Sequence, residues 1–420
     1  MNTRPARGGV LVVGGGFAGA YVARLLRHGA TIVDPHNFML FTPLLPEAAS
    51  GTLEPRHVVV PLRQMCRRSE LVVGRARSLD EERRVVTVET EAGELEITYD
   101  DLVLAAGAVP RVLPIPGLAE NALGFKTLAD AIYLRNHVLR ELEAAATEPD
   151  RARRQARLTY VFIGGGYAGV EALAELSDLV DDASRFYPEL ANVPRRWVLV
   201  DAAPRILPEV PRRLGEYAAR QLAARGFDIR VSTRLDEEGE GWARLSDGDR
   251  IETRTLVWTA GVQPVAIAHE WGLPVDGAGR LLVDPFLRVE GRAHIWALGD
   301  AARVPNAATP GEFDPPTSQH ALRQARRLAR NLRGEPAPYS YRMIGMGATL
   351  GRYKGIAEVM GIRLRGFPGW FVTRTYHLYQ LPLFTRKLRV VADWTTALLF
   401  RRDIVELGEL GHPRRIGEPP

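Results

Sequence analysis

The 420-residue chain contains a single cysteine, Cys66, and can therefore form no intramolecular disulfide. Because a CxxC pair is also absent, thiol redox chemistry is excluded and we expect no metal site. No uninterrupted run of about 18 or more apolar residues occurs, so a membrane-spanning helix is not expected. The first residues lead directly into a strand pattern, without the apolar stretch and cleavage site of a signal peptide, which predicts a cytoplasmic chain.

The excess of positive charge is small and unevenly distributed. The formal net charge is +5, from 55 basic and 50 acidic residues. Between Arg363 and Arg402 there are eight basic residues and one acidic residue, Asp393, so this segment carries +7 and the remainder of the chain carries −2. A basic segment on a near-neutral body does not indicate a nucleic-acid-binding protein.

The chain contains an internal repeat. The segment VLVVGGGFAGAYVARLL, which begins at Val10, returns as YVFIGGGYAGVEALAEL, which begins at Tyr160. Each copy is an apolar strand-like run, a glycine turn and an apolar pattern at helical spacing, which is how a βαβ nucleotide-binding unit begins. The repeat predicts an α/β protein with two similar Rossmann-like domains. The polar residues 148–157 are expected to form the crossing between them.

The first glycine turn, GGGFAG, fits the dinucleotide-binding pattern G-x-G-x-x-G. The first glycine of this pattern permits a tight turn, the second lets the backbone approach a pyrophosphate, and the third lets the helix pack closely on the strand. The helix that follows presents free N–H groups to the phosphates. An aspartate 20 residues after the first glycine is placed to bind ribose hydroxyls. The predicted contacts of this site are Gly14, Gly16, Phe17, Ala18, Gly19 and Asp34.

The second turn, GGGYAG, has its strand-terminal acid at Asp201, 37 residues after Gly164. We interpret the extra length, residues 177–194, as an insertion after the helix. A carboxylate at Asp201 would repel a 2'-phosphate and so favours NADH over NADPH, although Arg205 lies close enough in sequence to leave NADPH open. The predicted contacts are Gly164, Gly166, Tyr167, Ala168, Gly169 and Asp201.

Further motifs extend along nearly the whole chain. They are YDDLVLAAGAVP from Tyr99, TLVWTAGV from Thr255 and HIWALGDAA from His294, together with NFMLFTPLLPEAASG from Asn37 and PPTSQHALRQARRLARNL from Pro315. With the two glycine turns, these segments resemble the type II NADH dehydrogenases, the non-proton-pumping NADH:quinone oxidoreductases of the two-dinucleotide-domain flavoprotein superfamily.

The resemblance implies a nested domain order, in which the second Rossmann-like domain is inserted in the first. Residues 1–122 and 281–338 would form the two parts of an FAD-binding domain, and residues 123–280 would form an NADH-binding domain with its connecting segments. Residues 339–420 would form a C-terminal amphipathic module for peripheral membrane attachment, for a homodimer interface, or for both.

The resemblance also implies an activity. Tightly but non-covalently bound FAD would take a hydride from the substrate NADH and pass the electrons to a membrane quinone, without proton pumping. The implied additional FAD contacts are Ala106, Gly107, Gly299, Asp300 and Gln319. The implied additional NADH contacts are Glu171, Ala260 and Gly261.

Two of these residues are implied to be catalytic. Glu171 resembles the family glutamate near the nicotinamide and the flavin, and its alternative role is that of a solvated first-turn acid favoured by the helix dipole. Gln319 follows a predicted N-cap at Thr317 or Ser318 and resembles the family glutamine at the flavin and quinone. The family often repeats a glutamine four residues later. Here Arg323 stands at that position, and Gln324 comes one residue further.

The segment FTPLLPE occupies the region in which disulfide reductases of the superfamily carry a redox-active cysteine pair, so a dithiol relay is excluded. Its apolar side chains favour a large, apolar acceptor. Alternatively, they are core residues that pack under the flavin. The predicted quinone pocket comprises Thr42, Pro43, Leu44, Leu45, Gln319 and Arg323.

The C-terminal module contains a predicted amphipathic helix with one apolar stripe, formed by Val390, Val391, Trp394, Ala397 and Leu398. Basic residues flank this stripe, and aromatic residues such as Trp370 and Tyr376 precede it, which favours attraction to anionic lipid at the cytoplasmic face of the cell membrane. The alternative is that the stripe packs in a dimer or domain interface.

Two other functions remain open at this point. The first is a soluble NAD(P)H-dependent flavoprotein reductase that serves another acceptor. The second is a flavoprotein that binds both dinucleotides as a redox sensor without being an enzyme.

Overall fold

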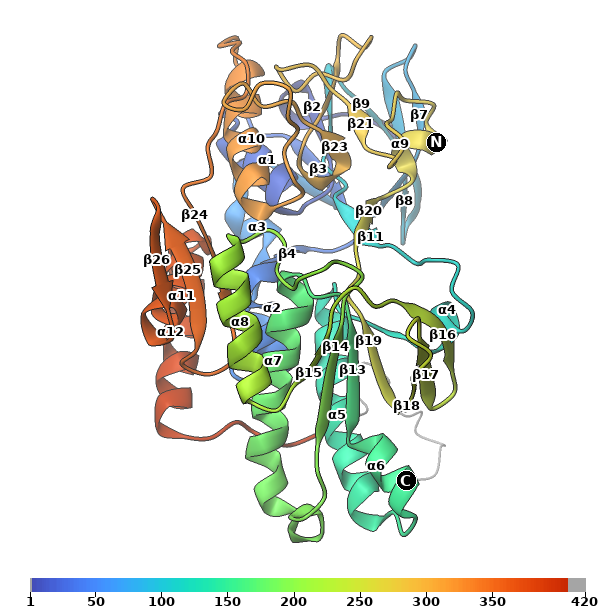
Figure 1. Ribbon diagram of the computed structural model, residues 1–420. Helices are drawn as coiled ribbons and strands as arrows, with labels where there is room; N and C mark the ends of the chain where they lie inside the picture. Colours follow the sequence, from blue (N-terminus) through green and yellow to red (C-terminus); the bar gives the residue numbers. More distant parts are fainter. Residues whose placement is uncertain (1, 407–420) are drawn as a thin grey trace.

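The computed structural model describes residues 2–406 and contains two five-stranded parallel sheets, one above the other in Figure 1. The first sheet has the order β22 (Ile295–Ala297), β10 (Asp101–Leu104), β2 (Val10–Val13), β3 (Thr31–Asp34) and β6 (Glu70–Val73). Strand β22 comes late in the chain yet pairs with β10. The chain therefore returns to the first sheet after it has formed the second, which confirms the predicted nested fold.

The second sheet has the order β12 (Leu123–Gly124), β19 (Thr255–Trp258), β13 (Thr159–Ile163), β14 (Arg196–Val200) and β15 (Asp228–Arg230). Its central strand β13 is buried along its whole length, as is β2 of the first sheet. Such continuous apolar runs are typical of parallel strands covered on both faces. Each glycine turn follows one of these central strands, at the carboxyl end where the direction of winding reverses and where α/β sheets bind ligands.

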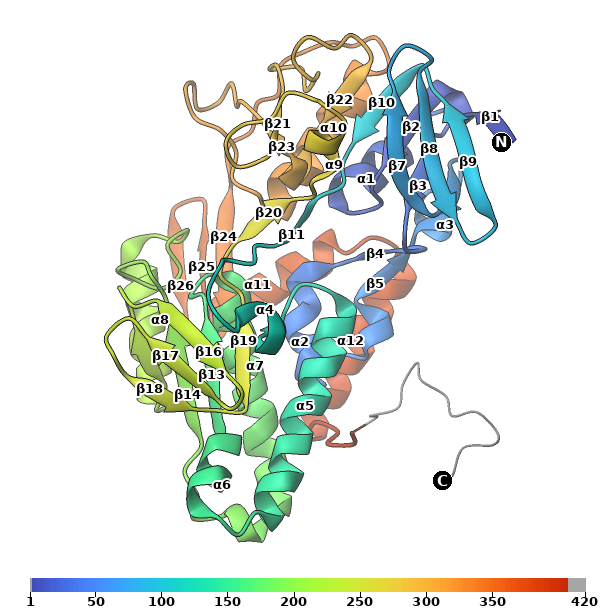
Figure 2. The same cartoon turned by 90° about the vertical axis from the view of Figure 1, so that its right-hand side faces the viewer.

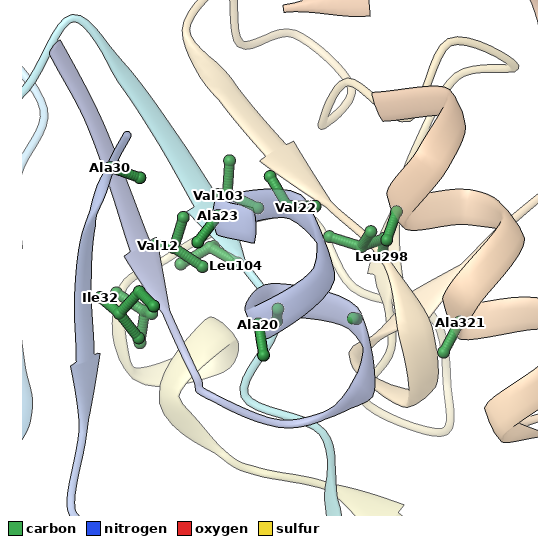
Figure 3. Close-up of a cluster of buried hydrophobic side chains, with 14 of the residues drawn as sticks. Val12, Ala20, Val22, Ala23, Ala30, Ile32, Val103, Leu104, Leu298 and Ala321 are labelled. Carbon is green, nitrogen blue, oxygen red and sulfur yellow. The ribbon is translucent and has the colours of Figure 1, made fainter. Parts of the chain in front are cut away.

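Helix α1 (Phe17–Leu25) fills the space between the first sheet and α10 (Ser318–Asn331). Its inner face consists of small residues such as Ala20 and Ala23, which are fully buried and permit close packing. Figure 3 shows α1 with Val12 and Leu104 of the sheet on one side and Leu298 and Ala321 on the other. Helix α1 is thus held between the first sheet and a helix that comes much later in the chain.

The remaining strands form small sheets around these two. β1 (Asn2–Pro5), β9 (Gly93–Thr98), β8 (Val85–Thr90) and β7 (Arg75–Asp80) form a four-stranded sheet, and β16 (Leu235–Gly239), β17 (Trp242–Leu245) and β18 (Arg250–Glu252) form a three-stranded one. The strand pairs are β4 (Phe38–Leu40) with β5 (Val59–Pro61), β11 (Ala108–Pro110) with β20 (Val262–Pro264), and β21 (Leu281–Leu282) with β23 (Ala302–Arg303). The other helices are α2 (Leu45–Ala49), α3 (Leu62–Met65), α4 (Leu118–Asn121), α5 (Leu128–Thr147), α8 (Arg212–Ala224) and α9 (Ile267–Glu270).

Two expectations about connecting segments are wrong. Residues 148–157 do not cross between the sheets, because β12 already pairs with β19 of the second sheet. They form helix α6 (Arg151–Arg157), whose first turn is capped by the Asp150 carboxylate. The extra length before Asp201 is partly helix as well, since α7 (Tyr167–Ala183) continues well beyond the expected end and buries Leu179, Val180 and Ala183. The expected insertion is therefore a longer helix followed by two short 3₁₀ turns.

The C-terminal module begins with an antiparallel sheet of β24 (Gly345–Thr349), β25 (Gly355–Val359) and β26 (Ile362–Arg365), followed by α11 (Phe367–Gln380) and α12 (Phe384–Leu399). These two helices contact Glu47 of α2, and Arg402, just after α12, contacts Glu175 of α7 (Figures 1 and 2). Among residues 2–406, no helix combines the length and apolarity needed to cross a membrane. Residues 407–420 of the predicted module lie outside the described part of the chain.

The predicted single stripe of α12 is wrong, because the helix has two apolar stripes. Val390 is 0% exposed and packs in the core with the half-buried Trp394. Val391 and Leu398 instead face solvent and share an outer stripe with Phe384 and Leu388. The inner stripe matches the alternative of a domain interface. Exposed apolar side chains on α11 and after α12 extend the outer surface, which we call the outer apolar face: Phe367, Phe371, Tyr379, Phe384, Leu388, Val391, Leu398, Leu399 and Phe400.

The basic residues of this module do not all face outward. Arg374 forms a buried ion pair with Glu47, and Arg402 pairs with Glu175, Asp178 and Asp182 of α7. Both arginine side chains are compensated inside the protein. The charge of +7 counted in the sequence therefore overstates what the module presents to a surface.

Candidate active site

In the first glycine turn, backbone atoms approach each other so closely that a Cβ atom would collide with them at two of the glycines. Gly14 has a φ of 106°, and a Cβ atom on it would lie 2.2 Å from the carbonyl oxygen of Ala105. A Cβ on Gly19 would lie 1.9 Å from the carbonyl oxygen of Gly14. Gly16, in contrast, has nothing within 4 Å of its Cβ position. Helix α1 begins at the next residue without a side-chain cap, so its N–H groups point toward open space beside a bare backbone.

The second turn repeats this geometry. Gly164 has a φ of 115°, and its Cβ position is 2.8 Å from the amide nitrogen of Ala260. A Cβ on Gly169 would again lie 1.9 Å from the carbonyl oxygen of the first glycine. The hydroxyl of Thr259 donates to the carbonyl oxygens of Ile163 and Gly164 and holds the turn against β19. Sequence reasoning did not identify Thr259, because nothing local distinguishes it from an ordinary strand residue.

The predicted contact residues Ala106 and Ala260 lie at equivalent positions beside the two glycine turns. The backbone of Ala105 and Ala106 lies against Gly14, as the backbone of Thr259 and Ala260 lies against Gly164. Gly107 and Gly261 follow with φ values of 72° and 85° and lead into the paired strands β11 and β20. These predicted contacts therefore surround the mouths of the two turns.

Asp34 and Asp201 hold the turns from the other side. Asp34 accepts hydrogen bonds from the backbone N–H groups of Gly15 (2.6 Å) and His36 (2.7 Å). Asp201 accepts in the same way from Gly165 and from Ala203 (2.6 Å). Both carboxylates are half-buried beside the bare turn, so unused lone pairs remain for sugar hydroxyls. With the uncapped helix and the exposed glycine backbone, each turn fits one dinucleotide.

The structure shows what Arg205 does. Its guanidinium donates to the carbonyl oxygens of Val210 (2.9 Å), Pro208 (2.5 Å) and Leu207 (3.3 Å), and so closes the loop after Asp201. These donors are therefore used within the protein and are not directed toward a 2'-phosphate. The remaining charged group at the turn is Glu209, whose carboxylate oxygen lies 3.6 Å from the Cβ position of Gly166.

Gly299 and Asp300 lie between α1 and α10. A Cβ on Gly299 would be 3.0 Å from the Cβ of Ala18, so this segment contacts the first turn of α1 directly. The N–H of Gly299 donates to the side-chain oxygen of Gln324 (2.8 Å), and the Gln324 amide donates to Asp314 (2.9 Å). Burial raises the pKa of Asp300. A small open pocket lies here, lined by Gly299, Asp300, Pro316, Thr317, His320 and Gln324.

Gln324 thus has a defined partner in this pocket, which its displaced position in the motif did not indicate. Thr317, not Ser318, is the N-cap of α10, and its hydroxyl accepts from the N–H of His320. The buried His320 imidazole lies 2.6 Å from the Asp314 carboxylate. This polar cluster holds the start of α10 against the Gly299 segment.

Gln319 points toward the C-terminal module. Its amide donates to the carbonyl oxygen of Gly345 (3.0 Å), and its oxygen accepts from the Tyr341 hydroxyl (3.2 Å). Arg323, one turn along α10, lies with its guanidinium 4.9 Å from the centre of the Tyr341 ring. Its buried Nη1 has no hydrogen-bond partner among the described residues. Gln319 and Arg323 therefore share one aromatic neighbour.

Glu171 is buried, so the alternative of a solvated first-turn acid is wrong. Its carboxylate accepts from the backbone N–H of Thr349 (2.8 Å) and from the Thr349 hydroxyl (3.2 Å). Burial raises the pKa of Glu171 to about 8, against the lowering effect of these two hydrogen bonds. Thr349 ends strand β24, whose first residue Gly345 contacts Gln319. The strand thus joins the two predicted catalytic residues, which lie 148 positions apart in the chain.

The segment after β4 separates into two kinds of residue. Thr42 and Pro43 are half-buried, whereas Leu44 and Leu45 are buried in two different core clusters. Glu47 follows at the start of α2 and is 4% exposed. It accepts from Arg374 of α11 and from the indole N–H of Trp394 in α12 (2.7 Å). The segment is therefore tied to the C-terminal module by a carboxylate that sequence reasoning did not single out.

Comparisons with known proteins agree with this geometry. Residues 8–325 match the model of the pyridine nucleotide-disulphide oxidoreductase family. A Dictyostelium discoideum protein named "Probable NADH dehydrogenase" is 30% identical over 394 residues, which cover 90% of this chain and 86% of that protein. The type II NADH:quinone oxidoreductase Ndh of Mycobacterium tuberculosis is 28% identical over 421 residues, which cover 95% of this chain and 89% of that protein. NDH2 from Plasmodium falciparum, solved in complex with NADH, has a similar fold, with a TM-score of 0.87 at 18% identity over 94% of this chain and 99% of that chain.

Two glycine substitutions test the geometry of the second turn. Gly169→Ala forces a methyl group onto the carbonyl oxygen of Gly164, so we expect the free energy of unfolding to fall by about 1–3 kcal/mol. Gly166→Ala adds its methyl group at an ordinary contact distance, 3.6 Å from the Glu209 carboxylate oxygen, and should change stability by less than about 0.5 kcal/mol while weakening NADH binding. Thermal denaturation and NADH titration measure the two effects. Equal stability of both variants would contradict the close packing described for Gly169.

The buried carboxyl group of Glu171 predicts a pH-dependent stability. Its pKa is raised from the ordinary 4.5 to about 8, so between these values the folded protein binds a proton that the unfolded chain has released. The stability of the wild type should therefore fall, relative to Glu171→Gln, as the pH rises from 4.5 to about 8, and the difference should be constant above that. Melting temperatures of both proteins across this range measure it. Parallel pH profiles would show that Glu171 is ionised throughout.

Proposed function

Because the chain belongs to the pyridine nucleotide-disulphide oxidoreductase family, and within it to the type II NADH dehydrogenases, we propose that it is an FAD-dependent NADH:quinone oxidoreductase. The observation that carries this proposal is the state of its only thiol. Cys66 is buried and its Sγ donates to the carbonyl oxygen of Ala20 (3.3 Å). Burial raises the pKa of Cys66 to about 12, so the thiolate needed for redox exchange is not formed. Electrons therefore leave the flavin directly and reach the acceptor without a dithiol relay.

When bound, FAD supplies an isoalloxazine ring that accepts a hydride from NADH and delivers two electrons to the quinone. The glycine turn at Gly14 would hold its pyrophosphate, with Asp34 at the ribose and Asp300 at the ribityl chain. The turn at Gly164 would hold NADH, with Asp201 at the adenosine ribose. We assign the first role to residues 1–122 and 281–338 and the second to residues 123–280.

Glu171 and Gln319 would stand on either side of the reacting atoms, at opposite ends of β24. Glu171, protonated at neutral pH, can donate a proton at its carboxyl oxygen. Gln319 has its amide fixed by Gly345 and Tyr341, so it can orient an acceptor without a change of rotamer. Thr42 and Pro43, with Arg323, would complete a pocket for the quinone ring and the start of its apolar tail. Leu44 and Leu45 are buried in two core clusters and would support this pocket from behind.

We further propose that the outer apolar face lies in the headgroup region of the cytoplasmic face of the cell membrane. The stripe of Phe384, Leu388, Val391 and Leu398 is exposed along α12, and Arg389 and Arg401 beside it are exposed as well. An apolar stripe flanked by basic residues is typical of helices that lie in a membrane interface. The competing use of the same stripe is the interface of a homodimer.

The acceptor is tested by anaerobic reduction of the purified protein. NADH should bleach the flavin at least about tenfold faster than NADPH, because the Asp201 carboxylate would repel a 2'-phosphate and Arg205 is engaged elsewhere. A menaquinone or ubiquinone analogue should then restore the oxidised spectrum. Reduction without reoxidation by quinone would point to a soluble reductase for another acceptor. A flavin that NADH does not bleach would point to a redox sensor.

The membrane proposal is tested by flotation on vesicles that contain anionic phospholipid. The double variant Leu388→Asp with Leu398→Asp should bind at least about tenfold more weakly, since each buried leucine contributes roughly 1.5–3 kcal/mol. Val112→Asp is the matched control, because Val112 is exposed between β11 and α4, outside the C-terminal module. Equal binding of all three proteins would contradict the proposal. A change of oligomeric state without vesicles would assign the stripe to a dimer.

A further inference from the structure

Positive charge is concentrated in four segments that contain no acidic residue. They are residues 17–28 at α1, 62–68 at α3, 318–334 at α10, and 376–392 at the junction of α11 and α12. Together they contain 13 arginine and lysine residues and no aspartate or glutamate. Because the whole chain carries +5, these segments carry +13 and the remainder carries −8. The excess of positive charge therefore resides in these four segments.

The four segments meet around α1. The thiol of Cys66, just after α3, donates to the carbonyl oxygen of Ala20 (3.3 Å). The Tyr21 hydroxyl donates to the carbonyl oxygen of Gln380 (3.3 Å), the last residue of α11. Helix α10 packs on another side of α1, where Figure 3 shows Ala321. Segments that lie far apart in the sequence thus bring their positive charges to one part of the molecule.

Three arginines surround one tyrosine where α1 and α10 meet. We call this group the Tyr21 cluster: Tyr21, Arg24, Arg323 and Arg326. The Arg24 guanidinium lies 5.8 Å from the centre of the Tyr21 ring. Burial raises the pKa of Tyr21 and the three arginines oppose this shift, so their guanidinium groups lie within electrostatic range of the hydroxyl. Arg24 and Arg326 are exposed, whereas Arg323 is half-buried.

The arginines of the Tyr21 cluster are not neutralised inside the protein. Among residues 2–406, Arg24, Arg323 and Arg326 form no ion pair, and the buried Nη1 of Arg323 has no hydrogen-bond partner. By contrast, Arg374 and Arg402 of the C-terminal module pair with buried acids. A guanidinium offers five N–H donors and keeps its charge at physiological pH, and like charges repel one another. An anion from outside the protein would therefore stabilise the cluster.

The Tyr21 cluster adjoins the outer apolar face. Gln380, which accepts from Tyr21, follows Tyr379, whose side chain is 75% exposed and belongs to that face. The Lys387 ammonium donates to the carbonyl oxygen of Tyr379 (2.7 Å) and lies 5.3 Å from the centre of its ring. Phe384, the first residue of α12, is 77% exposed. A cationic surface and an apolar surface therefore meet where α11 leads into α12.

This juxtaposition matches the chemistry of an anionic phospholipid. Such a lipid carries a phosphate group directly above its acyl chains, and guanidinium groups bind phosphate through paired N–H donors. Tyrosine and lysine side chains are typical of the boundary between headgroups and acyl chains. An acidic protein or a free anion would match the arginines but not their continuity with exposed apolar side chains.

We infer that the Tyr21 cluster binds the phosphate group of an anionic phospholipid whose acyl chains lie along the outer apolar face at Tyr379 and Phe384. This inference rests on the proposed membrane attachment and adds a lipid contact from the first Rossmann-like domain. The apolar contact belongs to the C-terminal module, and the phosphate contact belongs to α1 and α10. Two separate parts of the chain thus rest on the lipid, which prevents the protein from tilting about its C-terminal helices.

The test is flotation of the holoenzyme on two kinds of vesicle, one of phosphatidylcholine alone and one that also contains phosphatidylglycerol. The double variant Arg24→Gln with Arg326→Gln should bind the anionic vesicles about tenfold or more weakly, and the neutral vesicles within about twofold of the wild type. Arg151→Gln with Arg153→Gln is the matched control, since it removes the same charge from exposed positions of α6. Equal binding of both double variants to anionic vesicles would overturn the site.

Competition identifies the source of the phosphate group. Inorganic phosphate should release the wild type from anionic vesicles no more than sodium chloride does at the same ionic strength. A stronger release by phosphate would indicate a site for the free anion and would overturn the assignment to lipid.

A fluorescent label distinguishes direct contact from long-range attraction. Because the only native thiol, Cys66, is buried, Leu25→Cys next to Arg24 can be labelled selectively with an environment-sensitive fluorophore. Its emission should shift to the blue on anionic vesicles, and the same label on Ala152→Cys of α6 should not respond. No shift at position 25 on bound vesicles would overturn the site and leave the membrane proposal intact. A wild type that binds neither kind of vesicle would overturn both.

Discussion

Both dinucleotide turns depend on backbone packed directly on backbone. In each, the third glycine of the pattern places its α carbon against the carbonyl oxygen of the first, with no space for a methyl group. This contact brings the first turn of α1 or α7 over the end of the central strand. Only then do an uncapped helix, a bare glycine and a strand-end carboxylate meet at one place. The shape of the two dinucleotide sites follows from this steric constraint.

Buried carboxyl groups of glutamates connect these halves to the C-terminal module. Glu47 holds Arg374 and Trp394, Glu171 holds Thr349, and Glu175 holds Arg402. Taking such groups out of water is costly unless each finds partners, and each of them does. The module is thereby joined to α2 and α7 through specific polar contacts rather than through apolar packing alone. A change at α11 or α12 would consequently affect the segments that surround the proposed acceptor pocket.

Helix α12 shows how one short segment serves two surfaces. Val390 and the adjacent Val391 differ by about 100° around the helix, and this rotation separates a fully buried side chain from an exposed one. The inner stripe packs on the core through Trp394, while the outer stripe remains uncovered in the described chain. Because the inner side is fixed by Glu47, the outer side is presented in one orientation.

The sequence by itself determined the features that depend on neighbouring residues: the two strand–glycine–helix units, their closing aspartates, the nested order implied by the motifs, and the absence of a thiol pair. It did not determine which stripe of α12 faces inward, that Glu171 is buried, or that Arg205 closes its own loop. It also did not reveal Glu47 and Arg374, which pair across 327 positions. Local periodicity and turn chemistry are encoded within a few residues, whereas the partner of a buried charge is set by elements that meet only in the folded chain. Only the tertiary structure decided those pairings, and with them the arrangement of the candidate site.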